Sequence, residues 1–490
     1  MNKTLILFCM LSALCGTTVL FAEVTISFTC AKDCRVSLAV YNKDSQLVRT
    51  LLTGAPRKAG DYTATWDGRD RYGNPLPAGE YTWKALATTG LRAEFITQVG
   101  QNVDPAWERA TGNHEAPSSV AVDATGLYRL GATNEGGHWG VKTDLAGRHL
   151  WVNDRWWADP WVQSTVAVTL VKGRLFELMP NGDTYGYDAA TGRLFTGGDY
   201  DPKPWNLRWQ GYQAPAGARD DVARKLRAAQ SPRDLAGDAA NDLLVAAFPQ
   251  HDAVAWYSAA DGKLVDSANG LAGLTGVAVA KDGAVFAISQ GAVVTLTRTS
   301  KSPRVVIPAD KLESAWRLCV SPASGDIYVA ENSDLAKGKA IMPQPDASDG
   351  KVPNLAEGVK IANAPARRHH QVKRFSLDGA LLKTYGKAEG RGDGVYIATD
   401  FRHLTDIEAD HEGGFVITEG HHTPPRRSAR FDAEGKLLRE WYGAQHYGIL
   451  ACPEPNDPRF VWTMANADRS ALIRWEVDYA ARTSRVAEIY

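Results

Sequence analysis

The chain has 490 residues, enough for about three average domains or for one small domain and a large repeat array. Lysine plus arginine (55) nearly balances aspartate plus glutamate (56), and this net charge of -1 argues against nucleic acid as a partner. Its 45 glycines, 24 prolines, 15 tryptophans and 17 tyrosines favour short strands joined by turns over long helices. We therefore expect an all-β protein.

The first 22 residues have the layout of a secretory signal peptide. Lys3 precedes an apolar run from Leu5 to Leu14 that is too short to span a membrane comfortably. We place cleavage after Ala22, where the stretch of small and apolar residues ends. A lipoprotein cleaved before Cys15 is the alternative, although it would need a small residue where Leu14 stands. The mature chain is then secreted or periplasmic and keeps no integral membrane span.

Four cysteines remain after this cleavage. Cys30 and Cys34 flank a three-residue stretch typical of a hairpin tip, and an exported protein meets oxidising conditions, so we predict a disulfide between them. Cys319 and Cys452 are expected to be buried free thiols on inner strands. A metal site on Cys-x3-Cys would need further cysteine or histidine nearby, and the flanking sequence has none.

Residues 23–90 alternate between apolar and polar side chains, which predicts a small β-sandwich. The segments WDGRDRYG (66–73) and PAGEY (77–81) within it resemble the Ig-like domain of flagellar hook-capping proteins, a module also appended to many secreted bacterial proteins. This resemblance implies that the motif is structural, with glycines and aspartates shaping a tight loop and Trp66 and Tyr81 in the core. The flagellar role does not carry over, because the module occupies only a small part of the chain.

After a linker at 91–117, one four-stranded unit recurs up to residue 490. Its third strand ends near Asp-x-x-Gly, as in VKRFSLDGALLKTY and SARFDAEGKLLREW, and this pattern resembles the NHL-type repeat. The resemblance implies a β-propeller, for which we predict seven blades, with six or eight as alternatives. Two long intervals hold insertions at 201–231 and 333–368. The first strands of the units are VAVD (120–123), VAVT (166–169), DLAGD (234–238), VAVA (277–280), LCVS (318–321), DIEAD (406–410) and LACP (450–453).

In a propeller, the loops between second and third strands and the connections between blades lie at one end of the ring, which we call the mouth face. Histidines gather in these loops, either because the face is functional or because loops often carry histidine. We expect His138, Glu419, His421 and His422 to form one polar cluster at the channel mouth, with Glu135 on its rim. These four are the catalytic candidates, and the three histidines among them are the metal candidates.

Tryptophans follow the same loops, and exposed aromatic rings stack on the apolar faces of sugars. The alternative is that these rings are buried beneath the loops. Arg426 could neutralise the carboxylate of an acidic sugar. The candidate ligand-binding residues are therefore Trp139, Trp156, Trp157, Trp161, Trp205, Trp209, Glu135 and Arg426.

Two functions of different classes follow. The first is a secreted, non-catalytic propeller that binds a glycan or another extracellular ligand, with the Ig-like module as spacer or docking domain. The second is a metal-assisted lyase or hydrolase acting on an acidic polysaccharide, for which Ca, Mn or Zn would be the cofactor. A scaffold for protein partners is a third reading. Bound metal distinguishes the enzyme from the binder.

Overall fold

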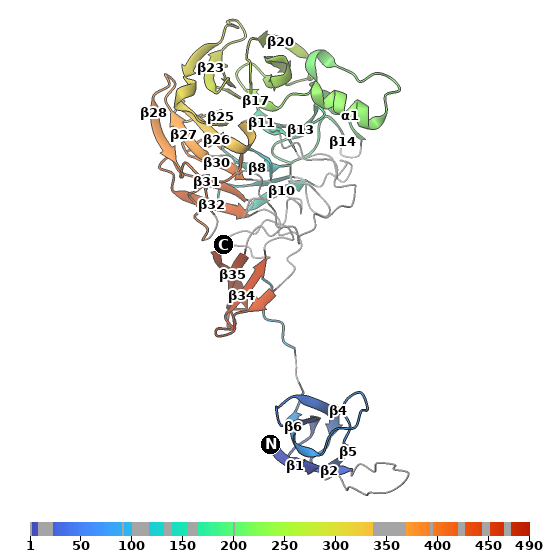
Figure 1. The fold of residues 1–490 in the computed structure, drawn as a ribbon. Helices are drawn as coiled ribbons and strands as arrows, with labels where there is room; N and C mark the ends of the chain where they lie inside the picture. Colours follow the sequence, from blue (N-terminus) through green and yellow to red (C-terminus); the bar gives the residue numbers. More distant parts are fainter. Residues whose placement is uncertain are drawn as a thin grey trace. The chain divides into compact units, whose positions relative to one another are not determined.

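We describe a computed structural model of the chain, which divides into two compact units, residues 1–95 and 96–490 (Figure 1). No helix among the described residues is long and apolar enough to cross a membrane. The described residues are 2–7, 23–90, 93–99, 117–131, 140–153, 165–198, 201–336, 369–392, 395–419, 427–442, 451–464 and 472–490.

The first unit is a two-sheet sandwich, with strand orders β1-β6-β3-β4 and β2-β5. Its core contains Leu38, Val40, Trp66, Tyr81 and Trp83, all buried, and the rings of Trp66 and Tyr81 meet edge to face with centroids 4.9 Å apart. The strands are β1 (Asn2–Leu7), β2 (Val24–Cys30), β3 (Cys34–Tyr41), β4 (Leu47–Arg57), β5 (Gly60–Trp66) and β6 (Gly79–Thr88).

The motif loop after β5 has the structural role that the sequence predicts. Oδ1 of Asp70 accepts hydrogen bonds from the backbone N–H groups of Tyr72 and Asn74, both at 2.8 Å. Gly68 and Gly73 have φ values of 69° and 84°, in the left-handed region that side chains disfavour. Hydrogen bonds between near neighbours therefore shape this loop, and Arg49 adds one from β4 to the carbonyl of Asp70.

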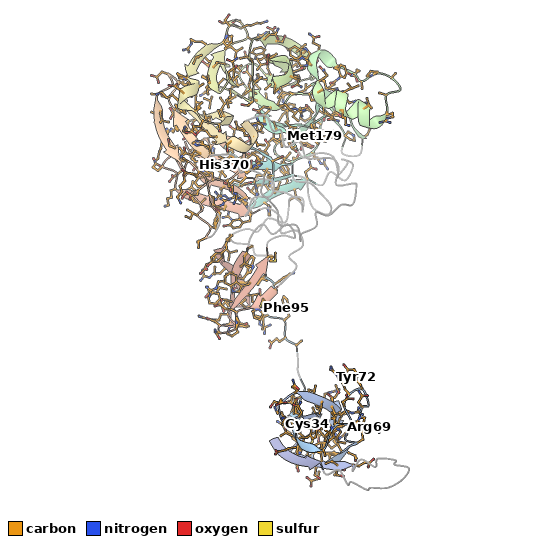
Figure 2. All side chains as sticks on the ribbon, in the orientation of Figure 1. Cys34, Arg69, Tyr72, Phe95, Met179 and His370 are labelled. Atoms are coloured by element: carbon orange, nitrogen blue, oxygen red, sulfur yellow. The ribbon has the colours of Figure 1, made fainter. Side chains whose placement is uncertain are left out.

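Strand β1 lies inside the predicted signal peptide and pairs antiparallel with β6 from Asn2↔Lys84 to Leu7↔Gly79. The sequence does not lead us to expect a strand there. Cys30 ends β2 and Cys34, labelled in Figure 2, begins β3; both are free thiols, so the predicted bridge is not confirmed.

The described residues of the second unit form seven four-stranded antiparallel sheets. The first four are β7 (Ser119–Asp123), β8 (Gly126–Leu130), β9 (Gly140–Thr143), β10 (His149–Asn153); β11 (Ala167–Val171), β12 (Arg174–Leu178), β13 (Asp183–Asp188), β16 (Trp205–Asn206); β17 (Asp234–Asp238), β18 (Leu243–Phe248), β19 (Ala253–Ser258), β20 (Leu264–Asn269); and β21 (Gly276–Val279), β22 (Val285–Ser289), β23 (Ala292–Leu296), β24 (Arg304–Ile307).

The other three sheets are β25 (Ala315–Val320), β26 (Ile327–Asn332), β27 (His370–Phe375), β28 (Leu381–Tyr385); β29 (Leu404–Ala409), β30 (Phe415–Glu419), β31 (Arg427–Phe431), β32 (Leu437–Tyr442); and β33 (Ala451–Pro453), β34 (Phe460–Met464), β35 (Leu472–Asp478), β36 (Thr483–Ile489). Smaller elements are β14 (Gly197–Gly198), β15 (Asp201–Pro202), α1 (Asp220–Ala229) and α2 (Ser333–Ala336), with 3₁₀ turns η1 (Trp209–Gly211), η2 (Pro249–His251) and η3 (Ala309–Lys311). Strand β16 shows that the segment expected as an insertion at 201–231 supplies the outer strand of the second sheet.

Six of these sheets form a closed ring (Figure 1). Each inner strand contacts the inner strand of the next sheet in the order β7, β11, β17, β21, β25, β29, and β29 contacts β7 again. The seventh sheet, β33–β36, packs instead beside the sixth, with Trp475 and Ile473 in one cluster with Tyr442 of β32. The β-propeller is thus confirmed, whereas seven blades are not, because the ring closes with six.

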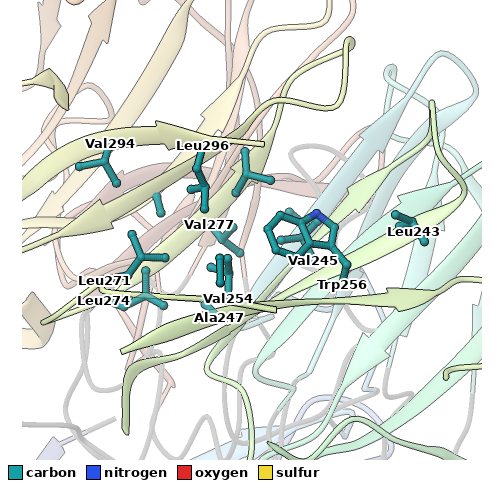
Figure 3. Packing of buried hydrophobic residues seen from close by; sticks show 14 residues of the cluster. Leu243, Val245, Ala247, Val254, Trp256, Leu271, Leu274, Val277, Val294 and Leu296 are labelled. Atoms are coloured by element: carbon teal, nitrogen blue, oxygen red, sulfur yellow. The ribbon is translucent and has the colours of Figure 1, made fainter. Parts of the chain in front are cut away.

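The hydrophobic core of the ring lies between neighbouring sheets. Figure 3 shows the cluster between the third and fourth sheets, where Trp256, Val245 and Leu271 pack toward Val277 and Val294. A smaller cluster of Val120, Leu127, Val416 and Trp441 closes the sixth sheet onto the first. Apolar side chains fill the interfaces between neighbouring sheets. The centre of the ring is lined instead by residues of the inner strands.

Cys319 and Cys452 differ because only one lies on an inner strand of the ring. Cys319, on β25, is buried as expected. Cys452 is exposed, contrary to expectation, because β33 belongs to the seventh sheet and is not one of the inner strands that form the ring.

Candidate functional site

Most of the predicted site residues lie outside the described residues. This applies to Glu135, His138, Trp139, Trp156, Trp157, Trp161, His421, His422 and Arg426. The cluster of His138, His421 and His422 with Glu419 therefore stays a prediction. The structure does place Glu419, Trp205 and Trp209, together with mouth-face residues that the sequence analysis did not select.

Glu419, the last residue of β30, is fully buried and ion-paired. Its carboxylate lies 2.7 Å from Nε of Arg427 and 3.0 Å from the guanidinium of Arg391, and it accepts the backbone N–H of Arg402 at 2.7 Å. Burial would raise the pKa of Glu419, but the charges of Arg391 and Arg427 outweigh it and hold the pKa below its ordinary value. This carboxylate is ion-paired with two arginines, and its catalytic role stays a prediction.

Glu331 occupies a similar position near the end of β26, in the neighbouring sheet. It is fully buried and lies 2.8 Å from Nε2 of His369 and 2.9 Å from Nζ of Lys373. Burial opposes ionisation here too, but the hydrogen bonds from His369 and Lys373 lower the pKa of Glu331. Two adjacent sheets thus each hold a neutralised carboxylate just beneath the mouth face. Next to His369, His370 begins β27 and is also buried (Figure 2).

The two described tryptophans of the ligand set are both half-buried and pack against the same hydrophobic cluster. Trp205 packs against Phe176, with centroids 5.5 Å apart, and covers Gly262, where an added Cβ would lie 2.5 Å from the indole. Part of its ring is thus engaged in packing while part stays exposed, and its role in ligand binding stays a prediction. Trp209 is half-buried and stacks on the imidazole of His251 with centroids 4.7 Å apart and planes 13° apart.

His251 is itself held in place on the mouth face. Its Nε2 lies 2.9 Å from Oε1 of Gln230, and Phe248 packs edge to face on Trp209 at 5.1 Å. Burial lowers the pKa of His251, which favours the neutral imidazole. The Trp209 ring is therefore fixed in orientation before any ligand arrives.

A cavity of about 130 Å³ runs between the inner strands and contains three carboxyl groups. Asp234 and Asp406 lie near the mouth, where these strands begin, and Glu408 lies two residues further along β29. Arg317 Nε approaches Asp234 at 3.7 Å. The sequence holds a signal for this site, because DLAGD and DIEAD carry acids in strands that are otherwise apolar.

The two aspartates also join neighbouring sheets. Oδ2 of Asp234 accepts the backbone N–H of Val277 at 2.8 Å. Oδ2 of Asp406 accepts the N–H of Val120 at 3.0 Å and the hydroxyl of Ser119. The bonds of Asp406, on the sixth sheet, with Ser119 and Val120, on the first sheet, close the ring.

The carboxyl groups hold protons more tightly than free side chains do. Burial, then the charge of Asp234, raises the pKa of Asp406 to about 6 against the opposing effect of Arg317. Burial, then the charges of Asp406 and Asp234, raises the pKa of Glu408 to about 8. Glu408 is therefore largely uncharged at neutral pH. Among the described residues, no group of three or more His, Cys, Asp or Glu side chains is arranged to hold a metal.

Comparisons with known proteins agree with the first unit. Residues 17–90 match the FlgD Ig-like domain family, which confirms the resemblance seen in the sequence. A search of curated proteins found no match.

Solved structures similar to this chain share little sequence with it. Hydrazine synthase of Kuenenia stuttgartiensis is 12% identical over 50% of this chain and 56% of its own, with a TM-score of 0.30. Streptogramin B lyase is 10% identical over 66% and 82%, with a TM-score of 0.34, and a chain of a nidogen–laminin complex is 11% identical over 68% and 97%, with a TM-score of 0.36. This chain thus spans about half of the hydrazine synthase chain. The propeller assignment rests on the closed order of the inner strands.

Proposed function

We propose that this protein is an exported binding protein whose propeller takes a glycan on the mouth face, with the Ig-like module as spacer or docking domain. The observation that carries the proposal is Trp209, a half-buried indole fixed by stacking on His251. An aromatic ring whose orientation is already fixed loses little conformational entropy when a sugar stacks on it. From the sequence pattern, Trp139, Trp156, Trp157 and Trp161 are expected in loops of the same face.

A glycan array followed by titration of the best ligand tests this proposal. Replacing one stacked ring in Trp209→Ala should weaken affinity by about 1–3 kcal/mol, by analogy with base stacking on aromatic side chains. Trp462→Ala is the matched control, because Trp462 is also half-buried but lies on β34, outside the ring. An array without any ligand, or equal affinities for the two variants, would refute glycan binding at Trp209.

The enzyme alternative depends on His138, His421 and His422. Elemental analysis of the purified protein for Ca, Mn and Zn is its direct test. A stoichiometric metal that is lost in His421→Ala would favour the lyase or hydrolase.

Export and the Cys30–Cys34 disulfide form part of the same proposal. What supports the bridge is that Cys30 ends β2 and Cys34 begins β3, with three residues between them. Oxidising conditions outside the cytoplasm would join such a pair. The mass of the protein after export, with and without reduction and alkylation, reports both the cleavage site and the bridge.

A further inference from the structure

Strand β6 becomes the edge of its sheet if residues 1–22 are removed. The sheet order is β1-β6-β3-β4, and β1 lies wholly within the predicted signal peptide. The register between β1 and β6 runs without a shift from residue 79 to residue 84, so this edge is able to hold an added antiparallel strand. An uncovered edge of this kind offers unpaired backbone groups to another strand.

The two edges of the remaining sheet differ in regularity. Strand β4 pairs with β3 through three register shifts, and such bulges make an edge a poor template for pairing. Strand β6 pairs with β3 in continuous register from Arg35↔Thr88 to Tyr41↔Thr82. The regular edge, β6, is therefore the one that is uncovered when β1 is removed.

The charged side chains of one β6 strand would complement those of a second β6 strand paired antiparallel with it. Glu80 and Lys84 are both exposed and point to the same face as Thr82, whereas Tyr81 and Trp83 face the core. If two β6 strands pair antiparallel around Thr82, each Glu80 stands opposite Lys84 of the second copy, and this happens twice by symmetry. Moving the centre to residue 80 or residue 84 would place like charges opposite each other, so the charge pattern selects Thr82.

We propose that the exported chain forms a two-fold dimer through antiparallel pairing of β6 with β6 of a second copy, centred on Thr82. The proposal rests on the proposed export, because β1 covers this edge until residues 1–22 are removed. A single short strand buries little surface, so the dimer is weak and forms at high concentration. Charged residues on an edge also serve to prevent pairing, and the experiment separates these two roles.

The experiment uses protein exported with its own leader, with its N-terminus established by mass spectrometry. Sedimentation velocity between roughly 1 and roughly 100 µM should show a dimer fraction that rises with concentration. Lys84→Glu should weaken association by about tenfold, because it sets like charges opposite each other at two places. The double variant Glu80→Lys with Lys84→Glu restores both pairs and should recover the dimer.

Lys32→Glu is the matched control, since it makes the same charge change on an exposed residue of the turn before β3. Loss of the dimer in Lys84→Glu with recovery in the double variant, while Lys32→Glu behaves as wild type, supports the proposal. A cleaved protein that stays monomeric, or a dimer unaffected by Lys84→Glu, overturns it and leaves export standing. Protein that retains residues 1–22 overturns the proposed export as well.

Discussion

The buried carboxyl groups of the ring differ from one another in protonation state. Glu419 and Glu331 are ionised in spite of burial because arginine, lysine or histidine neutralises them. Among the described residues no ion pair joins Glu408 to a cation; it lines the central cavity together with Asp406 and Asp234, and it keeps its proton. Buried glutamates of this protein are therefore charged at two sites and uncharged at a third. The local sequence does not show which of them is charged.

The stability of the ring should depend on pH through Glu408. Folding raises its pKa from 4.5 to about 8, so the folded state binds the proton more tightly and loses stability as pH rises between these values. Glu408→Gln keeps the uncharged form at every pH. We expect this variant to be more stable than wild type at pH 9, by up to a few kcal/mol, and to approach wild type near pH 5.

Denaturant unfolding of both proteins at the two pH values measures the difference. Glu434→Gln, a change at an exposed position in the turn before β32, should leave the pH dependence as in wild type. If the gap between Glu408→Gln and wild type were the same at pH 5 and pH 9, Glu408 would not be protonated in the folded state.

Among the structural elements, local ones follow from the sequence and distant pairings do not. The loop containing Asp70 and Gly73 forms its hydrogen bonds within a few residues, so its motif is sufficient to predict it. The unit whose first strand is expected at 450–453 has the period of a blade, but its sheet lies outside the ring. A repeat pattern predicts a four-stranded sheet and does not show which sheets will be its neighbours. Aromatic residues in a connection likewise do not reveal what they pack against, as the contact of Trp205 with Phe176 shows.

The Ig-like module should fold by itself. Its core, including Trp66 and Trp83, is contained within residues 23–90, although a domain of this size is only marginally stable. We expect residues 23–90 to unfold cooperatively under oxidising conditions and to lose roughly 2 kcal/mol when the short Cys30–Cys34 loop is opened by reduction. Circular dichroism against denaturant, with and without reductant, measures both. A Cys30→Ser, Cys34→Ser variant that still responds to reductant would show that the effect does not come from this bridge.

For the whole molecule, the junction between the sixth and first sheets determines whether the ring is closed. Trp441 is buried there, with the guanidinium of Arg129 4.8 Å from its ring and Val120 and Val416 beside it. Trp441→Ala should cost about 3–5 kcal/mol, the range seen when large aromatic residues are removed from cores.

The position of the damage is a sharper test than its size. Hydrogen exchange in Trp441→Ala should accelerate first in β7–β10 and β29–β32, on the two sides of the junction. Trp256→Ala removes an equally buried indole from the interface of the third and fourth sheets and should accelerate exchange there instead. Uniform acceleration in both variants would mean that the ring opens as one unit, with no preferred seam.

The bond between Ser119 and Asp406 joins residues 287 positions apart, and this separation has a consequence for biosynthesis. The first sheet leaves the ribosome long before its partner exists, so it keeps an unsatisfied side until the sixth sheet has been made. Contacts so distant in sequence form slowly, and an incomplete ring exposes apolar surface during the delay. A chain truncated before residue 404 would lack the strand that completes the circle, and we expect it to aggregate or to be degraded.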